Sequence, residues 1–215
     1  MNKLNLLAVA AGSMLLAQQS FSSELNFYGG LDVGMSTSDY IDDQLGDIAK
    51  EIERELNDPD VSFVGKADTS DTAFRLFGGI QLDENWGVQL SYANFGKYTA
   101  KFEGYHQGNF VDNESFSFKT HGFYIDGVYT HALQNQKTKL FGELGVGSTE
   151  LKAEGESDSG FTVHIGAGVR YEVNNNIDLE AGIHRYFVKA EDIYGKEKLG
   201  EAQIGFYSIG INYSF

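Results

Sequence analysis

The residues that could do chemistry in this sequence are five histidines and a large set of carboxylates. A hydrolase needs a nucleophile, a base and an orienting acid within reach of one another. None of the histidines stands in a recognisable catalytic motif; they are His106, His121, His131, His164 and His184. We therefore expect no enzymatic activity, and we interpret His164 and His184 as ordinary polar filling inside the fold.

The composition also argues against a bound cofactor or a metal site. The chain has no Cys, which excludes disulfides and thiolate metal sites. Its acidic residues do not follow the spacing of a calcium-binding EF-hand loop. A formal net charge of −15 makes nucleic acid an unfavourable partner. We expect no cofactor, no defined metal site and no nucleic-acid partner; binding of divalent cations by the acidic loops is left open.

The N-terminus has the features of an export signal. Met1-Asn2-Lys3 is a short positive start, an apolar run from Leu4 to Ala17 follows, and Ser20 and Ser22 are small residues suited to a cleavage site. The sequence therefore predicts a signal peptide over 1–22 and one mature domain over 23–215. No later stretch reaches the roughly 18 apolar residues of a membrane helix, so a membrane-embedded form must be a closed barrel.

The mature chain alternates apolar and polar residues with a period of two, which is typical of β-strands. This pattern recurs in eight segments, at about 25–36, 74–82, 86–92, 116–131, 139–152, 161–173, 177–184 and 206–215. The connections alternate between short ones near 83–85, 132–138 and 174–176 and longer, charged ones at 37–71, 103–115, 153–159 and 190–202. We predict an eight-stranded antiparallel transmembrane up-and-down barrel with both termini on the periplasmic side.

The glycines decide which face points outward. The polar face is dense in Gly, which weakens strands and contributes nothing on a solvated exterior. Inside a barrel of eight strands there is little lumen, and small residues leave room for a few large polar ones. We therefore expect the polar face to line the lumen and the apolar face to meet lipid. The alternative is a soluble, lipocalin-like barrel or a sandwich.

Four charged residues of the inner face are expected to lie close together. Pairing Val173 with Ile177 across the turn at 174–176 places Arg170 opposite Glu180. One register of the neighbouring hairpins then sets Glu143 beside Arg170 and brings Asp126 near Glu143. Because buried charges must be paired or hydrated, we predict a charge belt across the lower lumen made of Asp126, Glu143, Arg170 and Glu180. This belt either only fills and locks the lumen or gates a small passage.

The first long connection carries a different pattern, one of helical spacing. Apolar residues recur every three or four positions among acidic ones and form one stripe, made of Ile41, Leu45, Ile48, Ile52 and Leu56. Pro59 follows as a stop signal. We predict a short amphipathic helix in the first extracellular loop, packed either on its own loops or against an extracellular partner.

The end of the chain resembles outer-membrane barrels of the OmpA-like and OmpX-like family. The run from Tyr207 to Phe215 resembles their C-terminal signature, and 71–92 and 166–171 resemble their second hairpin and sixth strand. The resemblance implies that Tyr213 and Phe215 are an assembly signal read by the barrel-assembly machinery. It also implies a lumen in which salt bridges plug or gate a small passage. The chain stops before the position of the peptidoglycan-binding domain of full-length OmpA, so we expect no tether to the cell wall.

These observations predict an integral protein of the bacterial outer membrane. It would be a monomer in contact with outer-membrane lipid and lipopolysaccharide, with a role in envelope integrity or surface contacts and at most weak passage of small solutes. Two alternatives remain open at this point: a surface adhesin or receptor acting through acidic outer loops, and a narrow diffusion channel. Barrels that act as lipid A deacylases carry a His-x-Ser-Asn arrangement, which is missing here.

Overall fold

A computed structural model describes residues 26–38, 54, 60–107, 109–153, 156–189 and 201–215. Two of the predictions lie outside these residues. One is the signal peptide at 1–22, and the other is the amphipathic stripe formed by Ile41, Leu45, Ile48, Ile52 and Leu56. Within the described part of the chain, no helix is long and apolar enough to cross a membrane.

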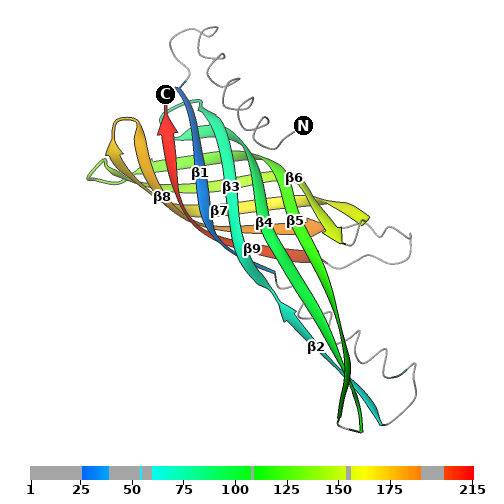
Figure 1. Cartoon of the computed structure of the whole chain (residues 1–215). Coiled ribbons are helices and arrows are strands. Elements are labelled where there is room, and N and C mark those ends of the chain that lie inside the picture. The colour runs from blue at the N-terminus through cyan, green and yellow to red at the C-terminus, as the bar shows by residue number, and fades with distance from the viewer. Residues whose placement is uncertain (1–25, 39–53, 55–59, 108, 154–155, 190–200) are drawn as a thin grey trace, which may run out of the picture.

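The described residues form one antiparallel sheet that closes on itself (Figure 1). β1 pairs with both β3 and β9, and β4 pairs with β5, so eight strands make a ring. The predicted eight-stranded barrel is confirmed. The strands are β1 (Asn26–Ser38), β2 (Val61–Asp68), β3 (Ser70–Gln81), β4 (Trp86–His106), β5 (Asn109–Ala132), β6 (Thr138–Ala153), β7 (Glu156–Asn174), β8 (Ile177–Lys189) and β9 (Glu201–Ser214).

The two faces of the ring differ as the alternation predicts. Leu90, Leu144 and Ile209 point away from the bore and are 64%, 65% and 67% exposed. Polar side chains of the other face, such as Arg75 and Gln89, are fully buried in the bore. In water this arrangement would expose a broad apolar belt to solvent. In a membrane, lipid covers the same belt.

One end of the barrel, here called the turn end, carries the connections from β3 to β4, from β5 to β6 and from β7 to β8. β3 is joined to β4 there by a tight turn in which the Asp83 carboxylate accepts hydrogen bonds from the backbone N–H groups of Asn85 (2.8 Å) and Trp86 (2.7 Å). These two bonds lower the pKa of Asp83. Tyr28 of β1 pairs with Ser214 of β9, so the start of β1 and the end of β9 lie at the same turn end.

At the opposite end the same sheet extends beyond the ring, which the sequence does not predict. Two connections expected to be longer, 103–115 and 153–159, are instead mostly strand. β4 runs to His106 and β5 begins at Asn109, while β6 runs to Ala153 and β7 begins at Glu156. β2 pairs with the outer part of β4 from Val61↔His106 to Asp68↔Thr99. Figure 1 shows β2 and the outer parts of β4 and β5 projecting well beyond the ring. We call β2 with residues 99–106 and 109–117 the outer sheet.

A β-bulge separates the outer sheet from the ring. The register of β4 on β5 shifts between Asn94 and Gly96, and Gly96 has a φ of +82°. A bulge adds one residue and reverses which face the following side chains occupy. Phe95 is the extra residue of the bulge, and both Phe95 and Tyr98, three positions later, are buried in the bore. Glycine is needed at this position because other residues are strained at positive φ.

Candidate functional site

The inner side chains of β8 show how the bore is filled from the turn end to the outer end. Asp178 and Glu180 come first, His184 follows, and Tyr186 and Val188 come last; all five are buried. Charged groups, imidazoles and aromatic rings thus succeed one another along the barrel axis. Inward side chains of the other strands join these groups at each level, so each level forms a layer across the bore.

Arg75 of β3 joins strands that lie on different sides of the ring. Its Nε donates a hydrogen bond to Asp32 Oδ2 (2.8 Å), and its Nη1 donates to Glu143 Oε2 (2.5 Å) on β6. Its Nη2 lies 3.4 Å from Glu180 Oε1 on β8. β3 is separated from β6 and from β8 by two strands in either direction around the ring. One fully buried guanidinium therefore bridges three strands through three carboxylates across the lumen.

The four residues of the predicted charge belt all point into the bore and are all buried. Arg170 Nε donates to Glu180 Oε2 (2.6 Å), and Arg170 Nη2 lies 4.0 Å from Glu143 Oε1. Asp126 does not contact the other three; its carboxylate accepts hydrogen bonds from Ser91 Oγ (3.2 Å) and from His164 Nδ1 (2.6 Å). The structure thus brings together three of the four residues and places Asp126 with a histidine.

The strand registers explain this difference. Arg170 faces Glu180 across β7 and β8, but the turn pairs Asn174 with Ile177, and Val173 lies in an irregularity of the ladder. The expected pair of Val173 with Ile177 is therefore wrong. Glu143 pairs with Gly166 and not with Arg170. Glu143 and Arg170 come close to each other because their long side chains extend along the barrel axis.

We call Asp32, Arg75, Glu143, Arg170 and Glu180 the charged layer. Sequence reasoning missed two of its members, Asp32 and Arg75. Both follow the alternation onto the inner face, and they are register partners across β1 and β3. The connection between these strands spans 39–69, so no turn fixes their register from the sequence. The sequence offered one signal: an arginine at an inner position is rare, and a buried arginine needs a carboxylate partner nearby.

The charged layer also packs against aromatic rings. The Arg170 guanidinium lies over the Phe141 ring at 4.6 Å from its centroid, and the Arg75 guanidinium lies over Phe77 at 5.0 Å. Guanidinium groups in such positions gain cation–π attraction and lose contact with water. The charges are therefore held in fixed positions and are not left free to move within a water-filled channel.

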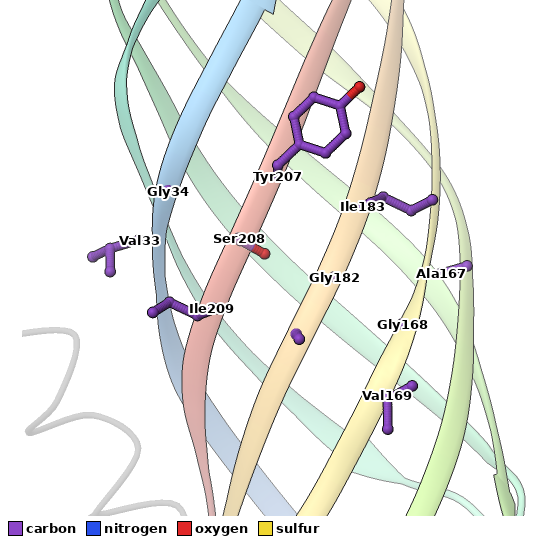
Figure 2. A pocket seen from close by; sticks show the side chains of 11 residues that line it. Val33, Gly34, Ala167, Gly168, Val169, Gly182, Ile183, Tyr207, Ser208 and Ile209 are labelled. Atoms are coloured by element: carbon purple, nitrogen blue, oxygen red, sulfur yellow. The ribbon is translucent and has the colours of Figure 1, made fainter.

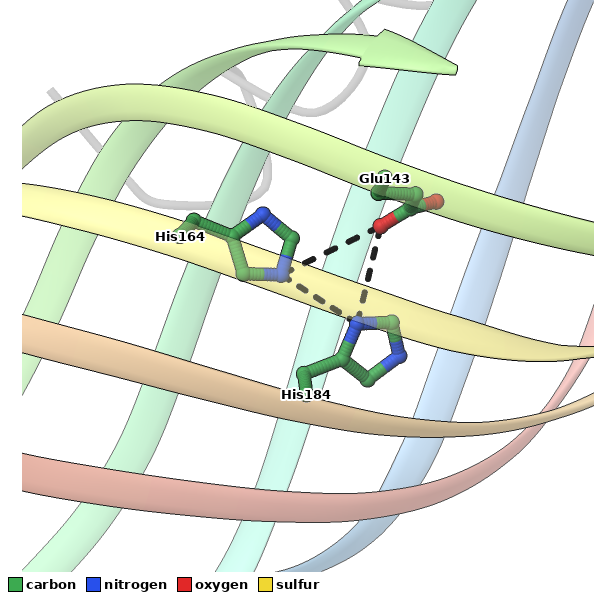
Figure 3. Close-up of side chains that lie close together, drawn as sticks. All are labelled: Glu143, His164 and His184. Carbon is green, nitrogen blue, oxygen red and sulfur yellow. Dashed lines mark hydrogen bonds and ion pairs between the residues drawn. The ribbon is translucent and has the colours of Figure 1, made fainter. Parts of the chain in front are cut away.

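Two histidines, predicted as polar filling, lie next to this layer and face a carboxylate (Figure 3). His164 Nε2 lies 3.3 Å from His184 Nδ1. Glu143 Oε2 lies 3.9 Å from His164 Nε2 and 3.5 Å from His184 Nδ1. We call Glu143, His164 and His184 the His–Glu triad. Its three side chains come from β6, β7 and β8, which are consecutive in the ring.

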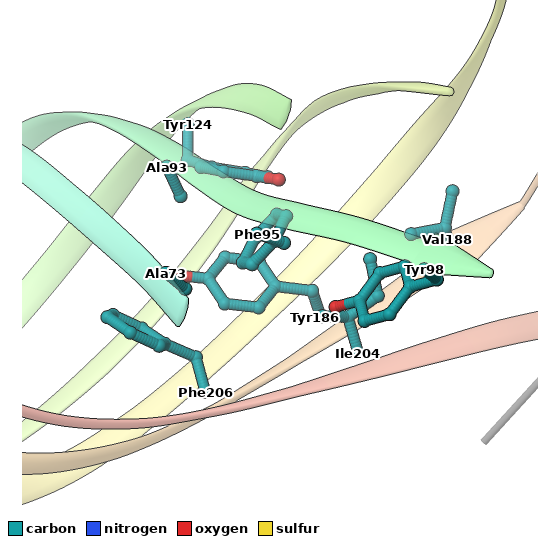
Figure 4. Packing of buried hydrophobic residues seen from close by; sticks show 9 residues of the cluster. All are labelled: Ala73, Ala93, Phe95, Tyr98, Tyr124, Tyr186, Val188, Ile204 and Phe206. Atoms are coloured by element: carbon teal, nitrogen blue, oxygen red, sulfur yellow. The ribbon is translucent and has the colours of Figure 1, made fainter. Parts of the chain in front are cut away.

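Aromatic and aliphatic residues fill the bore on the side of the triad that is nearer the outer sheet. Figure 4 shows how they pack against one another. The Tyr186 ring stacks on His164 at 4.3 Å with an interplanar angle of 10°, and contacts Phe95 at 4.7 Å and Tyr124 at 4.8 Å. We call this group the aromatic plug; its members are Ala73, Ala93, Phe95, Tyr98, Tyr124, Tyr186, Val188, Ile204 and Phe206. The charged layer and the plug together fill the bore at two levels.

A shallow groove lies on the outer wall of the ring, over β1, β9, β8 and β7 (Figure 2). Its walls include Val33, Val169, Ile183 and Ile209, and small residues form its floor. These side chains belong to the outward apolar face. The groove is therefore part of the outward apolar surface of the ring.

The residues implied as an assembly signal lie at the turn end of β9. Tyr213 and Phe215 are each 43% exposed on the outer wall, and their rings contact each other at 5.0 Å. Trp86 and Tyr129 form a similar outward pair at 5.0 Å on β4 and β5. Aromatic rings in these positions are typical of the interface between lipid and water. Their role in assembly stays a prediction.

Comparison with known proteins gives a consistent result. A family model described as the outer membrane protein beta-barrel domain matches residues 6–215. The structure is similar to Neisserial surface protein A, with 15% identity, a TM-score of 0.52 and coverage of 90% of this chain and 100% of that one. It is also similar to the outer membrane protein OprG from Pseudomonas aeruginosa, with 14% identity, a TM-score of 0.50 and coverage of 88% and 95%. A search of curated proteins found no match.

Proposed function

Because the chain belongs to the outer membrane protein beta-barrel domain family, we propose that it is a closed membrane anchor that presents its outer sheet at the cell surface for contacts with other molecules. The observation that carries this proposal is the bridge that Arg75 makes across the bore to Asp32, Glu143 and Glu180. Ion pairs that join distant strands brace the ring, and with the aromatic plug they leave the bore filled. This favours a structural and surface role over a diffusion channel.

The outer sheet supports the surface role because it is ordered by its own contacts. Lys66 Nζ donates to the Glu103 carboxylate at 2.9 Å, and Tyr105 OH donates to the same carboxylate at 2.9 Å. The hydrogen bond raises the pKa of Lys66 and lowers that of Glu103, so both are charged at neutral pH. Near its tip the sheet exposes Phe110 (57%) and Val111 (64%). Successive strand residues point to opposite faces, so each face of the outer sheet offers an apolar side chain for contact with another molecule.

In the proposed orientation the outer sheet lies outside the cell, and the start of β1 and the end of β9 face the periplasm. Bacterial barrels keep short turns on the periplasmic side and carry their larger segments, here the outer sheet, on the outside. The assembly signal at Tyr213 and Phe215 would then meet the barrel-assembly machinery from the periplasm. Outer-membrane lipid and lipopolysaccharide would surround the ring, and a single chain is sufficient because the ring is complete without a partner.

Single cysteines test this orientation cleanly, because the chain contains none of its own. Asn113→Cys places a thiol on an exposed position of the outer sheet, and Gln134→Cys places one in an exposed turn at the other end. On intact cells a membrane-impermeant maleimide should label the Asn113→Cys variant strongly and the Gln134→Cys variant only after the outer membrane is permeabilised. The reverse pattern, or equal labelling of both on intact cells, would overturn the proposal.

A further inference from the structure

The His–Glu triad has the geometry of a metal site, and we propose that it binds one divalent transition-metal ion inside the barrel. The three facing atoms are separated by 3.3, 3.5 and 3.9 Å. Bonds of about 2.0–2.1 Å at tetrahedral angles place ligand atoms roughly 3.3 Å apart, so a small contraction would bring these atoms into coordination. Two imidazole nitrogens and one carboxylate oxygen form the same donor set as the protein ligands in several zinc enzymes.

Neighbouring groups orient both imidazoles toward the ion. The Asp126 carboxylate accepts a hydrogen bond from His164 Nδ1 at 2.6 Å. A carboxylate can only accept, so Nδ1 carries the proton and the lone pair of Nε2 points at the triad. His184 Nε2 lies 3.4 Å from Ser208 Oγ, which leaves Nδ1 of that ring as the ligand atom. Carboxylate–histidine contacts of this kind accompany most histidine metal ligands.

The charge of the surrounding layer calls for a cation. Six buried ionisable side chains lie in or beside this layer: the guanidiniums of Arg75 and Arg170 and the carboxyl groups of Asp32, Asp126, Glu143 and Glu180. With every one of these six groups ionised and the imidazoles neutral, the cluster has a formal charge of −2. Uncompensated charge is costly in a buried site. One divalent ion at the triad would neutralise the cluster.

Two glycines leave the space that the triad occupies. A Cβ atom at position 166 would lie 2.6 Å from His184 Nδ1 and 3.1 Å from Glu143 Oε2. A Cβ atom at position 182 would lie 2.7 Å from His184 Nε2. Any side chain at Gly166 would therefore press on both of these ligand atoms. The triad therefore fits in the bore only because position 166 is glycine.

The donor set selects the class of metal. Imidazole ligands suit zinc, cobalt, nickel and copper ions, whereas calcium and magnesium prefer oxygen ligands throughout. Glu143 Oε2 can bind an ion and still accept from Arg75 Nη1, because a carboxylate oxygen has two acceptor directions. Because three protein atoms face the ion, a fourth position is left for a small exogenous ligand.

Cobalt(II) is the probe that tests the proposal, because tetrahedral Co²⁺ absorbs visible light and can replace Zn²⁺. The full chain without a histidine tag should be refolded into detergent micelles with Co²⁺ present, since the triad is buried, and then freed of unbound metal. We expect one Co²⁺ per chain and a tetrahedral absorption band. We also expect the urea midpoint to rise with Co²⁺ concentration, as it must for a ligand of the native state.

Matched variants locate the site. His184→Gln and His164→Gln should lose the band and the bound ion, and Asp126→Asn should weaken binding about 10–100-fold. Gly166→Ala keeps every ligand and should also weaken binding. His131→Gln changes an exposed histidine of the turn end and should bind like the parent chain. Folding of each variant is verified by its heat-dependent gel mobility.

Two results would overturn the proposal. One is a folded parent chain that retains no Co²⁺, which would mean that the imidazoles serve only the hydrogen-bond network. The other is undiminished binding in folded His184→Gln or Gly166→Ala, which would place the ion elsewhere. Neither result would affect the proposed surface role, because that role depends on the outer sheet and the filled bore.

Discussion

Replacing Arg75 with alanine should destabilise the barrel more than any other single substitution in the bore. The change leaves the carboxylates of Asp32, Glu143 and Glu180 buried without their shared partner. Breaking a buried ion pair by removing one member costs about 3–5 kcal/mol, because the remaining charge is uncompensated. Urea unfolding in micelles measures this effect through the fluorescence of Trp86, the single tryptophan of the chain.

A second variant separates loss of the charge from loss of the side chain. Arg75→Met combined with Glu143→Gln removes one charge of each sign and should recover part of the stability lost in Arg75→Ala. Lys66→Ala serves as the surface control, since its ion pair with Glu103 is exposed, and its urea midpoint should match that of the parent chain. An Arg75→Ala barrel as stable as the parent would contradict the central role of this residue.

Replacing Leu144 with arginine should also destabilise the folded barrel strongly. Leu144 is 65% exposed on the outer face of β6, between Gly142 and Val146, in the middle of the ring. A charged side chain facing lipid near the bilayer midplane costs about 2–4 kcal/mol in outer-membrane barrels. The measurement is reversible urea unfolding of the barrel in phospholipid vesicles, compared with the parent chain.

Val111 gives this experiment a closely matched control. It is 64% exposed, almost the same as Leu144, but it lies in the outer sheet, 14 residues before Ile125 of the same strand. At about 3.3 Å per residue it lies roughly 46 Å along the strand from the ring centre, beyond the apolar band. Val111→Arg should therefore leave the stability nearly unchanged. Equal losses for the two variants would mean that lipid does not cover the outer face of the ring.

The ring was predictable because each of its strands has one face toward lipid and the other toward the bore. That environment enforces a strict period of two, which is visible in the sequence. The outer sheet was not predictable for the same reason. Residues 109–115 of β5 are all exposed, so no face of that segment needs apolar residues. A strand with two solvated faces has no alternation and looks like a charged loop.

The site was predictable only where a short turn fixes the register. Arg170 faces Glu180 because two residues connect their strands, and the prediction survived an error in the turn itself. Contacts across the bore, such as those from Arg75 to Glu143, depend on how the ring closes and have no local signal. The triad shares this property, since its members lie on three strands and no sequence spacing resembles a metal motif.

The most direct test of a filled bore is the ionic conductance of the refolded full chain in a planar lipid bilayer. Because Arg75, its carboxylate partners and the aromatic plug occupy the bore, we expect the chain to insert without current steps above those of the bare bilayer. Reproducible, ohmic current steps from the parent chain would contradict this expectation, because ions would then be passing through the bore.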